Sequence, residues 1–117
     1  MCIRDRNRGC YDSFAAVYDC PVPTISAVNG FCIGGGLGIA GASDFIIAAG
    51  DSTYCLPEID RGALGAATHL MRMVGVQKAR RMLYTCETID AQELFSLGGC
   101  TEVVPPAQLE SLSLIHI

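Results

Sequence analysis

The chain has 117 residues, enough for one modest domain or for a piece of a larger one. Its 50% hydrophobic content argues against disorder and indicates apolar faces that further sequence or other subunits cover. The formal net charge of −4, with no basic stripe, excludes a nucleic-acid partner, and no apolar stretch is both long enough and free of glycine and charge to span a membrane.

Predicted helices and strands alternate along the chain. The predicted strands cover residues 24–28, 45–49, 53–56 and 102–104. The predicted helices cover residues 10–19, 37–42, 66–74 and 76–85, and a further segment that Asp90 begins and Gly98-Gly99 ends. Asp90 and Glu93 have the spacing of a capping box. This alternation favours a mostly parallel α/β arrangement.

The two ends of the chain are expected to be foreign to the natural protein. Residues 1–6 back-translate to a DNA string whose reverse complement, read in another frame, encodes the Leu-Ser-Leu-Ile-His found at residues 112–116. This relation is typical of sequencing-adaptor read-through, so residues 1–6 and 112–117 are excluded from fold reasoning. We therefore expect a partial domain over residues 7–111, an internal fragment whose natural sequence continues at both ends.

Seven cysteines are scattered along the chain, and none forms a C-x-x-C pair. Cys32, Cys55 and Cys86 stand in apolar or loop-edge contexts, where a free cysteine acts as a small hydrophobic residue. We expect reduced thiols in the cytoplasm, with neither a disulfide framework nor a metal site.

The rest of the chain is organised around the glycine triplet at Gly34–Gly36, where a strand runs through a turn into a helix. The first N–H groups of a helix have no partners inside it, and the helix dipole adds a partial positive charge there. Such a junction can hold an anion, or an oxygen that becomes anionic during a reaction. Taken alone, the triplet could equally be a tight turn packed against a neighbouring strand.

The motifs around this triplet follow a specific order. They are Ala27-Val28-Asn29-Gly30 before the triplet, Asp44 before an apolar strand, Pro57-Glu58 after a short edge strand, and Gly98-Gly99 before Val103-Val104-Pro105. In this order the chain resembles the crotonase superfamily, the enoyl-CoA hydratases and isomerases, from Asn7 to about Leu109. The resemblance implies a crotonase-like spiral of ββα units, an acyl-CoA substrate, no cofactor beyond the coenzyme A that the substrate carries, and assembly into homotrimers or hexamers.

The resemblance also implies roles for the glycine triplet and for one glutamate. The backbone N–H of Gly35 matches one of two donors that stabilise an enolate-like thioester oxygen, the other donor being in an upstream loop that this chain lacks. Gly34 and Gly36 would border the bound thioester. Glu58 matches the second of the two acid–base glutamates of hydratases, whereas the position of the first is Gly38, which cannot transfer a proton. Without the resemblance, Glu58 could also be an exposed loop carboxylate.

Three further residues near Glu58 have alternative interpretations. Asp60 and Arg61 could supplement the missing carboxylate or orient substrate, or form a surface ion pair. His69 lies within an apolar helix, where a packing histidine is the ordinary interpretation.

A narrower resemblance comes from Asn7-Arg8-Gly9-Cys10 and from residues 61–70, Arg-Gly-Ala-Leu-Gly-Ala-Ala-Thr-His-Leu. These look most like crotonases of bacterial steroid-ring breakdown, which hydrolyse a carbon–carbon bond in a cyclic β-diketone carried on CoA. The sequence thus indicates an enzyme with one carboxylate, either such a hydrolase or a double-bond isomerase. A 2-enoyl-CoA hydratase of the β-oxidation type and a catalytically silent binding subunit stay open. The fragment alone is expected to be inactive.

Overall fold

The structure is a computed structural model that describes residues 3–63 and 65–115. Its strands are β1 (Ile25–Val28), β2 (Phe31–Ile33), β3 (Phe45–Ala49), β4 (Thr53–Cys55), β5 (Ile89–Asp90) and β6 (Glu102–Val104). Its α-helices are α1 (Ile3–Tyr18), α2 (Gly35–Ala42), α3 (Ala67–Val74), α4 (Val76–Thr85), α5 (Ala91–Ser96) and α6 (Leu109–Ile115). The 3-10 helices are η1 (Glu58–Arg61) and η2 (Pro106–Gln108).

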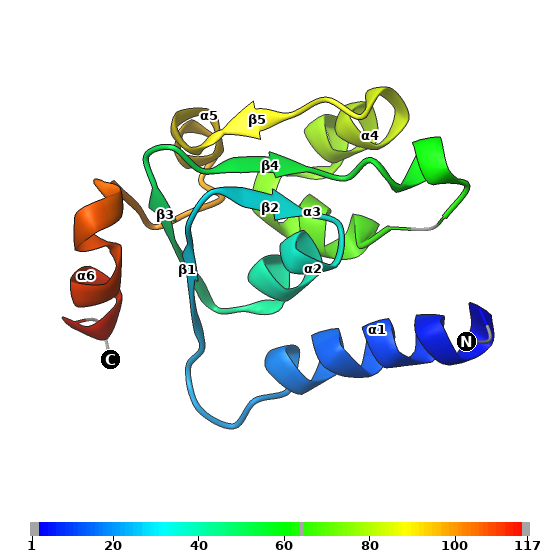
Figure 1. The fold of residues 1–117 in the computed structure, drawn as a ribbon, viewed down its shortest axis with the longest axis horizontal. Helices are drawn as coiled ribbons and strands as arrows, with labels where there is room; N and C mark the ends of the chain where they lie inside the picture. The colour runs from blue at the N-terminus through cyan, green and yellow to red at the C-terminus, as the bar shows by residue number, and fades with distance from the viewer. Residues whose placement is uncertain (1–2, 64, 116–117) are drawn as a thin grey trace.

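The strands form two small sheets, with the orders β1-β3-β6 and β2-β4-β5 (Figure 1). All pairings are parallel except the one between β4 and β5. The chain crosses from the first sheet to the second between β1 and β2, and again between β3 and β4, and a helix follows each crossing. The predicted mostly parallel α/β arrangement, with its repeated ββα order, is confirmed.

The main core lies between the second sheet and the helices α2 to α5. Its fully buried side chains include Leu37, Tyr54, Leu56, Leu70 and Met82. The buried Tyr54 hydroxyl is hydrogen-bonded to the Ser52 hydroxyl at 3.0 Å, so this polar group has a partner inside the core. A smaller apolar cluster under α6 joins β3 and β6, and Figure 1 shows α6 beside β1 and β3. This core fixes α2, and therefore the glycine triplet at its start.

Four elements differ from the sequence prediction. β2 and β5 were not predicted, because three or two residues are too few to show the alternation of a half-buried strand. The first helix is longer than the predicted 10–19 and spans Ile3–Tyr18. α6 falls largely in the segment excluded from fold reasoning, where no helix was predicted.

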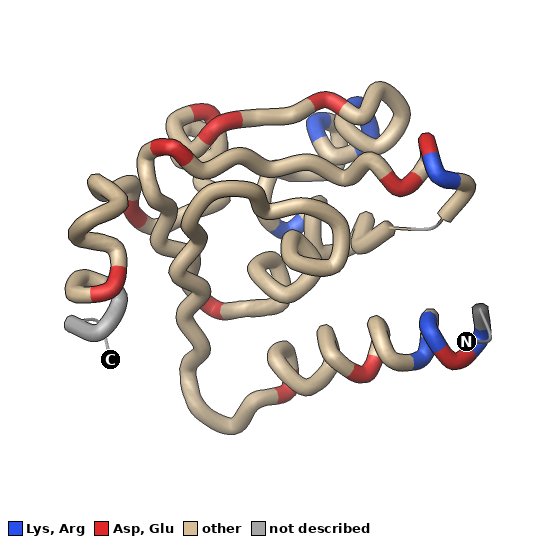
Figure 2. Tube along the Cα trace, in the orientation of Figure 1, with Lys and Arg blue, Asp and Glu red and all other residues tan. Residues whose placement is uncertain are grey.

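Two cations of α4, Lys78 and Arg81, are paired with acidic side chains at one edge of the molecule (Figure 2). Lys78 Nζ lies 2.9 Å from Glu87 Oε1 and 2.6 Å from Glu93 Oε1, and Arg81 Nε lies 3.0 Å from Glu87 Oε2. Glu93 belongs to α5, so these pairs join two helices. Asp90 caps α5 by accepting a hydrogen bond from the Glu93 N–H at 2.8 Å, as the capping-box spacing predicts.

The described cysteines all have free thiols, and Cys32, Cys55 and Cys100 are buried. Burial raises the pKa of Cys32 and of Cys100 to about 11. The interpretation of Cys32 and Cys55 as small hydrophobic residues is therefore confirmed. Among the described residues, no helix is long and apolar enough to cross a membrane, and no group of three or more His, Cys, Asp and Glu could hold a metal ion.

Candidate active site

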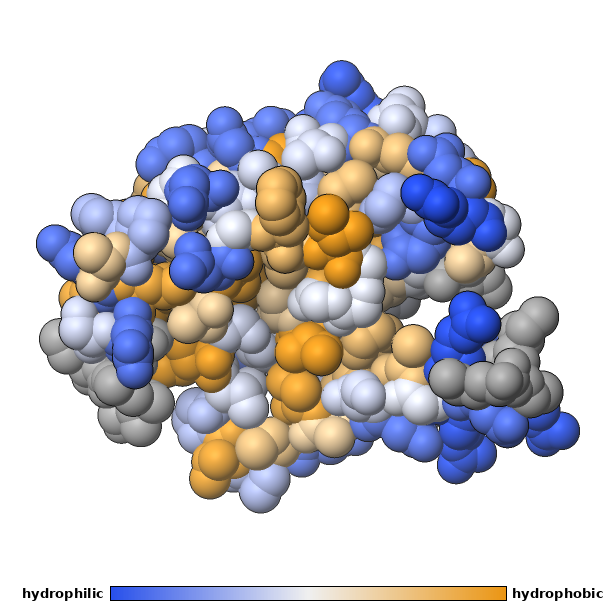
Figure 3. Space-filling model, viewed as in Figure 1, coloured by the Kyte–Doolittle hydropathy of each residue, from blue (hydrophilic) through white to orange (hydrophobic). Residues whose placement is uncertain are grey.

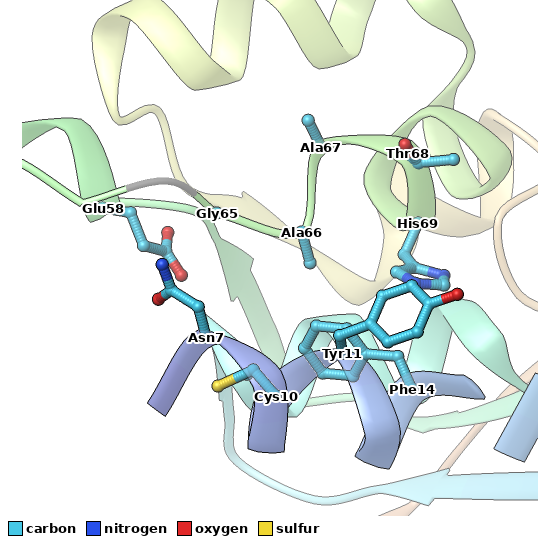
Figure 4. Close-up of a pocket in the computed structure, with 11 residues that line it drawn as sticks. Asn7, Cys10, Tyr11, Phe14, Glu58, Gly65, Ala66, Ala67, Thr68 and His69 are labelled. Atoms are coloured by element: carbon cyan, nitrogen blue, oxygen red, sulfur yellow. The ribbon is translucent and has the colours of Figure 1, made fainter. Parts of the chain in front are cut away.

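A cavity of about 510 Å³ lies between α1 and the segment that leads into α3. α1 lines one side of it with Asn7, Cys10, Tyr11 and Phe14, as Figure 4 shows. Figure 3 shows the surface hollowed between α1 and the rest of the molecule. The volume is within the range of sites for small molecules, roughly 300–1,000 Å³.

Gly35, the middle residue of the glycine triplet, lies at one end of this cavity. Gly34 is the N-cap of α2 with φ 60° and ψ −119°, a conformation that a residue with a Cβ adopts only under strain. Its N–H donates to the Cys55 carbonyl at 3.2 Å, which ties the turn to β4. Gly35 begins α2 and lines the cavity. Its N–H has no partner inside the helix, so an oxygen bound there would meet a free donor and the positive end of the helix dipole.

The Glu58 carboxylate lies between two glycines, beside this same end of the cavity. A Cβ on Gly34 would lie 2.8 Å from Glu58 Oε1, and a Cβ on Gly65 would lie 3.0 Å from Glu58 Oε2. The carboxylate can therefore occupy this position only because both residues lack side chains. Oε2 is buried with no hydrogen-bond partner, and the Asn7 amide points towards the carboxylate (Figure 4). A buried oxygen without a partner is costly, and a ligand proton would satisfy it.

Gly38, the position without a proton-transferring side chain, is covered by other residues. It is buried, and a Cβ built on it would lie 2.6 Å from Phe14 Cε1 and 2.9 Å from Ala66 Cβ, with Phe14 Cζ closer still. A glutamate here would collide with the Phe14 ring. Glu58 is thus the only carboxylate among the described residues that line the cavity.

The structure brings some of the predicted site residues together and leaves others apart. Gly35 and Glu58 line the cavity, and Gly34 lies directly against the Glu58 carboxylate. Gly36 instead borders a separate hollow of about 280 Å³ beside β1 and β2. Asp60 and Arg61 are exposed on η1 and do not line the cavity. The functional roles of all six residues stay predictions.

Asp60 faces a cysteine rather than the cavity. Burial and the Asp60 carboxylate together raise the pKa of the Cys86 thiol. Among the described residues, Arg61 forms no salt bridge with Asp60 or with Glu58.

The sequence did not predict that α1 and α3 form a wall of this cavity. His69 lines the cavity, and its ring meets the Phe14 ring edge to face, with centroids 5.1 Å apart and planes at 71°. The packing contact predicted for His69 is found, but the residue also borders the cavity and its Nδ1 is buried with no hydrogen-bond partner. Burial, and then the charge of Arg72, lower the pKa of His69, which favours the neutral imidazole. The helical spacing of Phe14 predicted an apolar face but not its contact with α2.

Comparison with known proteins decides the family. Residues 4–116 match the enoyl-CoA hydratase/isomerase family. The chain belongs to that family. Among solved structures, DspI of Pseudomonas aeruginosa superposes with a TM-score of 0.91 at 32% identity, over 97% of this chain and 48% of that chain. An enoyl-CoA hydratase of Bacillus anthracis superposes with a TM-score of 0.88 at 31% identity, over 99% and 47% of the two chains. The predicted crotonase membership is confirmed.

Two curated relatives are more similar in sequence. The (7aS)-7a-methyl-1,5-dioxo-2,3,5,6,7,7a-hexahydro-1H-indene-carboxyl-CoA hydrolase of Mycobacterium tuberculosis is 54% identical over 110 residues, 94% of this chain and 44% of the relative. The enzyme of the same name from Rhodococcus jostii is 54% identical over 106 residues, 91% and 41% of the two chains. Both names specify a fused-ring dioxo-acyl-CoA, in agreement with the narrower resemblance. The chain spans less than half the length of these relatives.

Proposed function

We propose that the complete protein is a hydrolase that opens a carbon ring of a cyclic β-diketone carried on coenzyme A. One observation carries this proposal: Glu58 is the only carboxylate of the described cavity lining, and it lies against Gly34, the residue directly before Gly35 and the start of α2. The 54% identity with two hydrolases of a dioxo-acyl-CoA supports the same reaction.

In this reaction Glu58 is the single acid and base. It accepts a proton from water as the water oxygen bonds to a ring carbonyl carbon. The adjacent carbon–carbon bond then breaks, the former ketone becomes a carboxylic acid, and the electron pair of the broken bond becomes an enolate, which reaches the thioester oxygen in a substrate whose ring double bond conjugates the released carbon with the thioester. The Gly35 N–H donates to the enolate oxygen, an interaction worth about 3 kcal/mol in comparable oxyanion holes. Glu58 returns its proton to carbon, so one water is added and nothing else is consumed.

The other expectations for the complete protein rest on its family. Gly34 and Gly36 are proposed to border the bound thioester, and Asp60 and Arg61 to contact substrate beyond the described cavity. The protein is proposed to use no cofactor beyond the coenzyme A of its substrate, to assemble as a homotrimer or hexamer, and to work in the cytoplasm.

A 2-enoyl-CoA hydratase is the second candidate, because a crotonyl-CoA hydratase of Syntrophomonas wolfei is 41% identical over 90 residues, 74% of this chain and 35% of the relative. The geometry favours it less. A second carboxylate has no room at Gly38, where the Phe14 ring lies.

The test uses the protein expressed from its complete reading frame. Glu58→Gln should lower turnover of a bicyclic dioxo-acyl-CoA by about 100-fold or more while leaving its dissociation constant unchanged, because the amide keeps the shape but cannot accept the proton. Asp51→Asn, on an exposed turn, is the matched control and should keep full turnover. Normal turnover by the Gln variant would refute the proposal. Rapid hydration of crotonyl-CoA by the unaltered protein would favour the hydratase instead.

A further inference from the structure

The aromatic wall of the cavity has a role that neither Glu58 nor the glycine triplet explains. We propose that Phe14 is the specificity-determining residue of this site: its ring closes the cavity above Gly38 and selects a ring-bearing acyl group over a short linear one. This inference rests on the proposed acyl-CoA function and names the class of acyl group that the site takes.

Phe14 separates the cavity from Gly38 of α2. Its ring lines the cavity, whereas Gly38 is buried behind it and does not. The ring edge contacts Gly38 so closely that a Cβ there would lie 2.6 Å from Cε1. Shortening Phe14 would therefore open the cavity towards Gly38, which the Ala66 methyl covers as well.

The ring has a further aromatic contact. His69 of α3 meets it edge to face with centroids 5.1 Å apart, a geometry that aromatic pairs prefer. Phe14 also packs against the main core cluster while remaining partly accessible. The ring is thus a fixed wall and not a mobile surface side chain.

The cavity has a polar region and an apolar region. Glu58 and Gly35 form a polar end, and Phe14, Tyr11 and Ala66 add apolar surface beyond it. An acyl ring held by its thioester at the polar end would bury one apolar face against this surface. A short linear acyl group has less area to bury and gains less from the contact.

The test measures dissociation constants of the full-length protein by calorimetry, with cyclohex-1-ene-carbonyl-CoA as the ring-bearing probe and crotonyl-CoA as the linear one. Phe14→Ala should weaken binding of the cyclic probe by about tenfold or more and that of the linear probe by less than about threefold, a ratio typical of a lost apolar contact. Phe14→Leu keeps apolar bulk and should fall between the unaltered protein and the Ala variant. Equal changes for both probes would overturn the proposal.

A second measurement needs no ligand. Gly38→Ala should lower the thermal midpoint because its Cβ meets both the Phe14 ring and the Ala66 methyl, and Phe14→Ala in the same chain should remove the part of that effect that comes from the ring. Additive effects would show that Phe14 does not lie on Gly38 and would overturn the proposal.

The two proposals fail in distinguishable ways. Full turnover by Glu58→Gln, with the Phe14 selectivity intact, would refute the proposed chemistry alone. Loss of the selectivity, with Glu58-dependent turnover intact, would refute the role of Phe14 alone.

Discussion

Gly65 has no side chain, yet replacing it should disable the candidate site. A Cβ at Gly65 would lie 2.7 Å from Leu56 Cδ2 and 3.0 Å from both Cδ and Oε2 of Glu58. Leu56 is fully buried in the main core and has little room to move. The new Cβ therefore strains Leu56, which should lower the thermal midpoint, and it also displaces the Glu58 carboxylate. Activity of the folded Gly65→Ala variant tests whether the position of that carboxylate matters.

The size of the effect follows from the contact distances. Ordinary contacts of a Cβ lie at 3.4–4 Å, so the carboxylate must retreat by between about 0.4 and 1 Å. Because a misplacement of about 1 Å can cost about 100-fold in rate, we expect kcat to fall by about 10- to 100-fold. This corresponds to about 1.4–2.7 kcal/mol of transition-state stabilisation. The dissociation constant of the acyl-CoA should change little.

The assay is steady-state turnover of a bicyclic dioxo-acyl-CoA by the full-length protein, with thermal unfolding measured in parallel. Gly9→Ala is the matched control, because a Cβ there meets nothing within 4 Å and its φ is not positive. The control should keep full activity. If Gly65→Ala also kept full activity with an unchanged thermal midpoint, the position of the Glu58 carboxylate between Gly34 and Gly65 would have no part in the reaction.

Two further predictions concern stability. Asp90→Ala removes the cap of α5 and should lower the free energy of unfolding by about 1 kcal/mol in urea titrations, whereas Asp90→Asn, which can still accept the Glu93 N–H, should lose much less. Burial lowers the pKa of His69 below its ordinary value of 6.5, so the unfolded chain binds more protons than the folded chain at acidic pH. The free energy of unfolding should therefore fall as the pH drops through 6.5 towards the lower folded pKa. His69→Gln should flatten that slope in urea midpoints measured at pH 7.5 and 5.5. A slope unchanged in the Gln variant would contradict the assignment to His69.

The sequence predicts the parts of the site that depend on neighbouring residues. The turn at Gly34–Gly36 can be read locally, because a glycine run between a strand and a helix has few alternatives. The Pro57-Glu58 pair after a strand is similarly local, and its partner Gly65 follows within the same loop. The order of strands and helices predicts the parallel arrangement, because parallel strands need crossover connections.

The sequence does not predict contacts between distant segments. Phe14 and Gly38 belong to different helices, and the spacing of Phe14 shows only that it lies on an apolar face. That face could have packed on any neighbour. β2 was missed for a related reason, since its pairing with β4 compensates for its three-residue length and for Phe31, which is 84% exposed. Tertiary pairing outweighs the weak local preference there.

The described thiols differ in how exposed they are, so they should differ in how fast a thiol-directed label reacts with them. Cys32, Cys55 and Cys100 are buried, and the raised pKa of Cys32 and of Cys100 keeps those two thiols protonated and unreactive at neutral pH. Cys10, by contrast, is exposed and lines the cavity. Among the described cysteines, a thiol-directed fluorophore should therefore react fastest at Cys10, ahead of the half-buried Cys20 and Cys86, and its emission there would respond to a ligand entering beside Glu58.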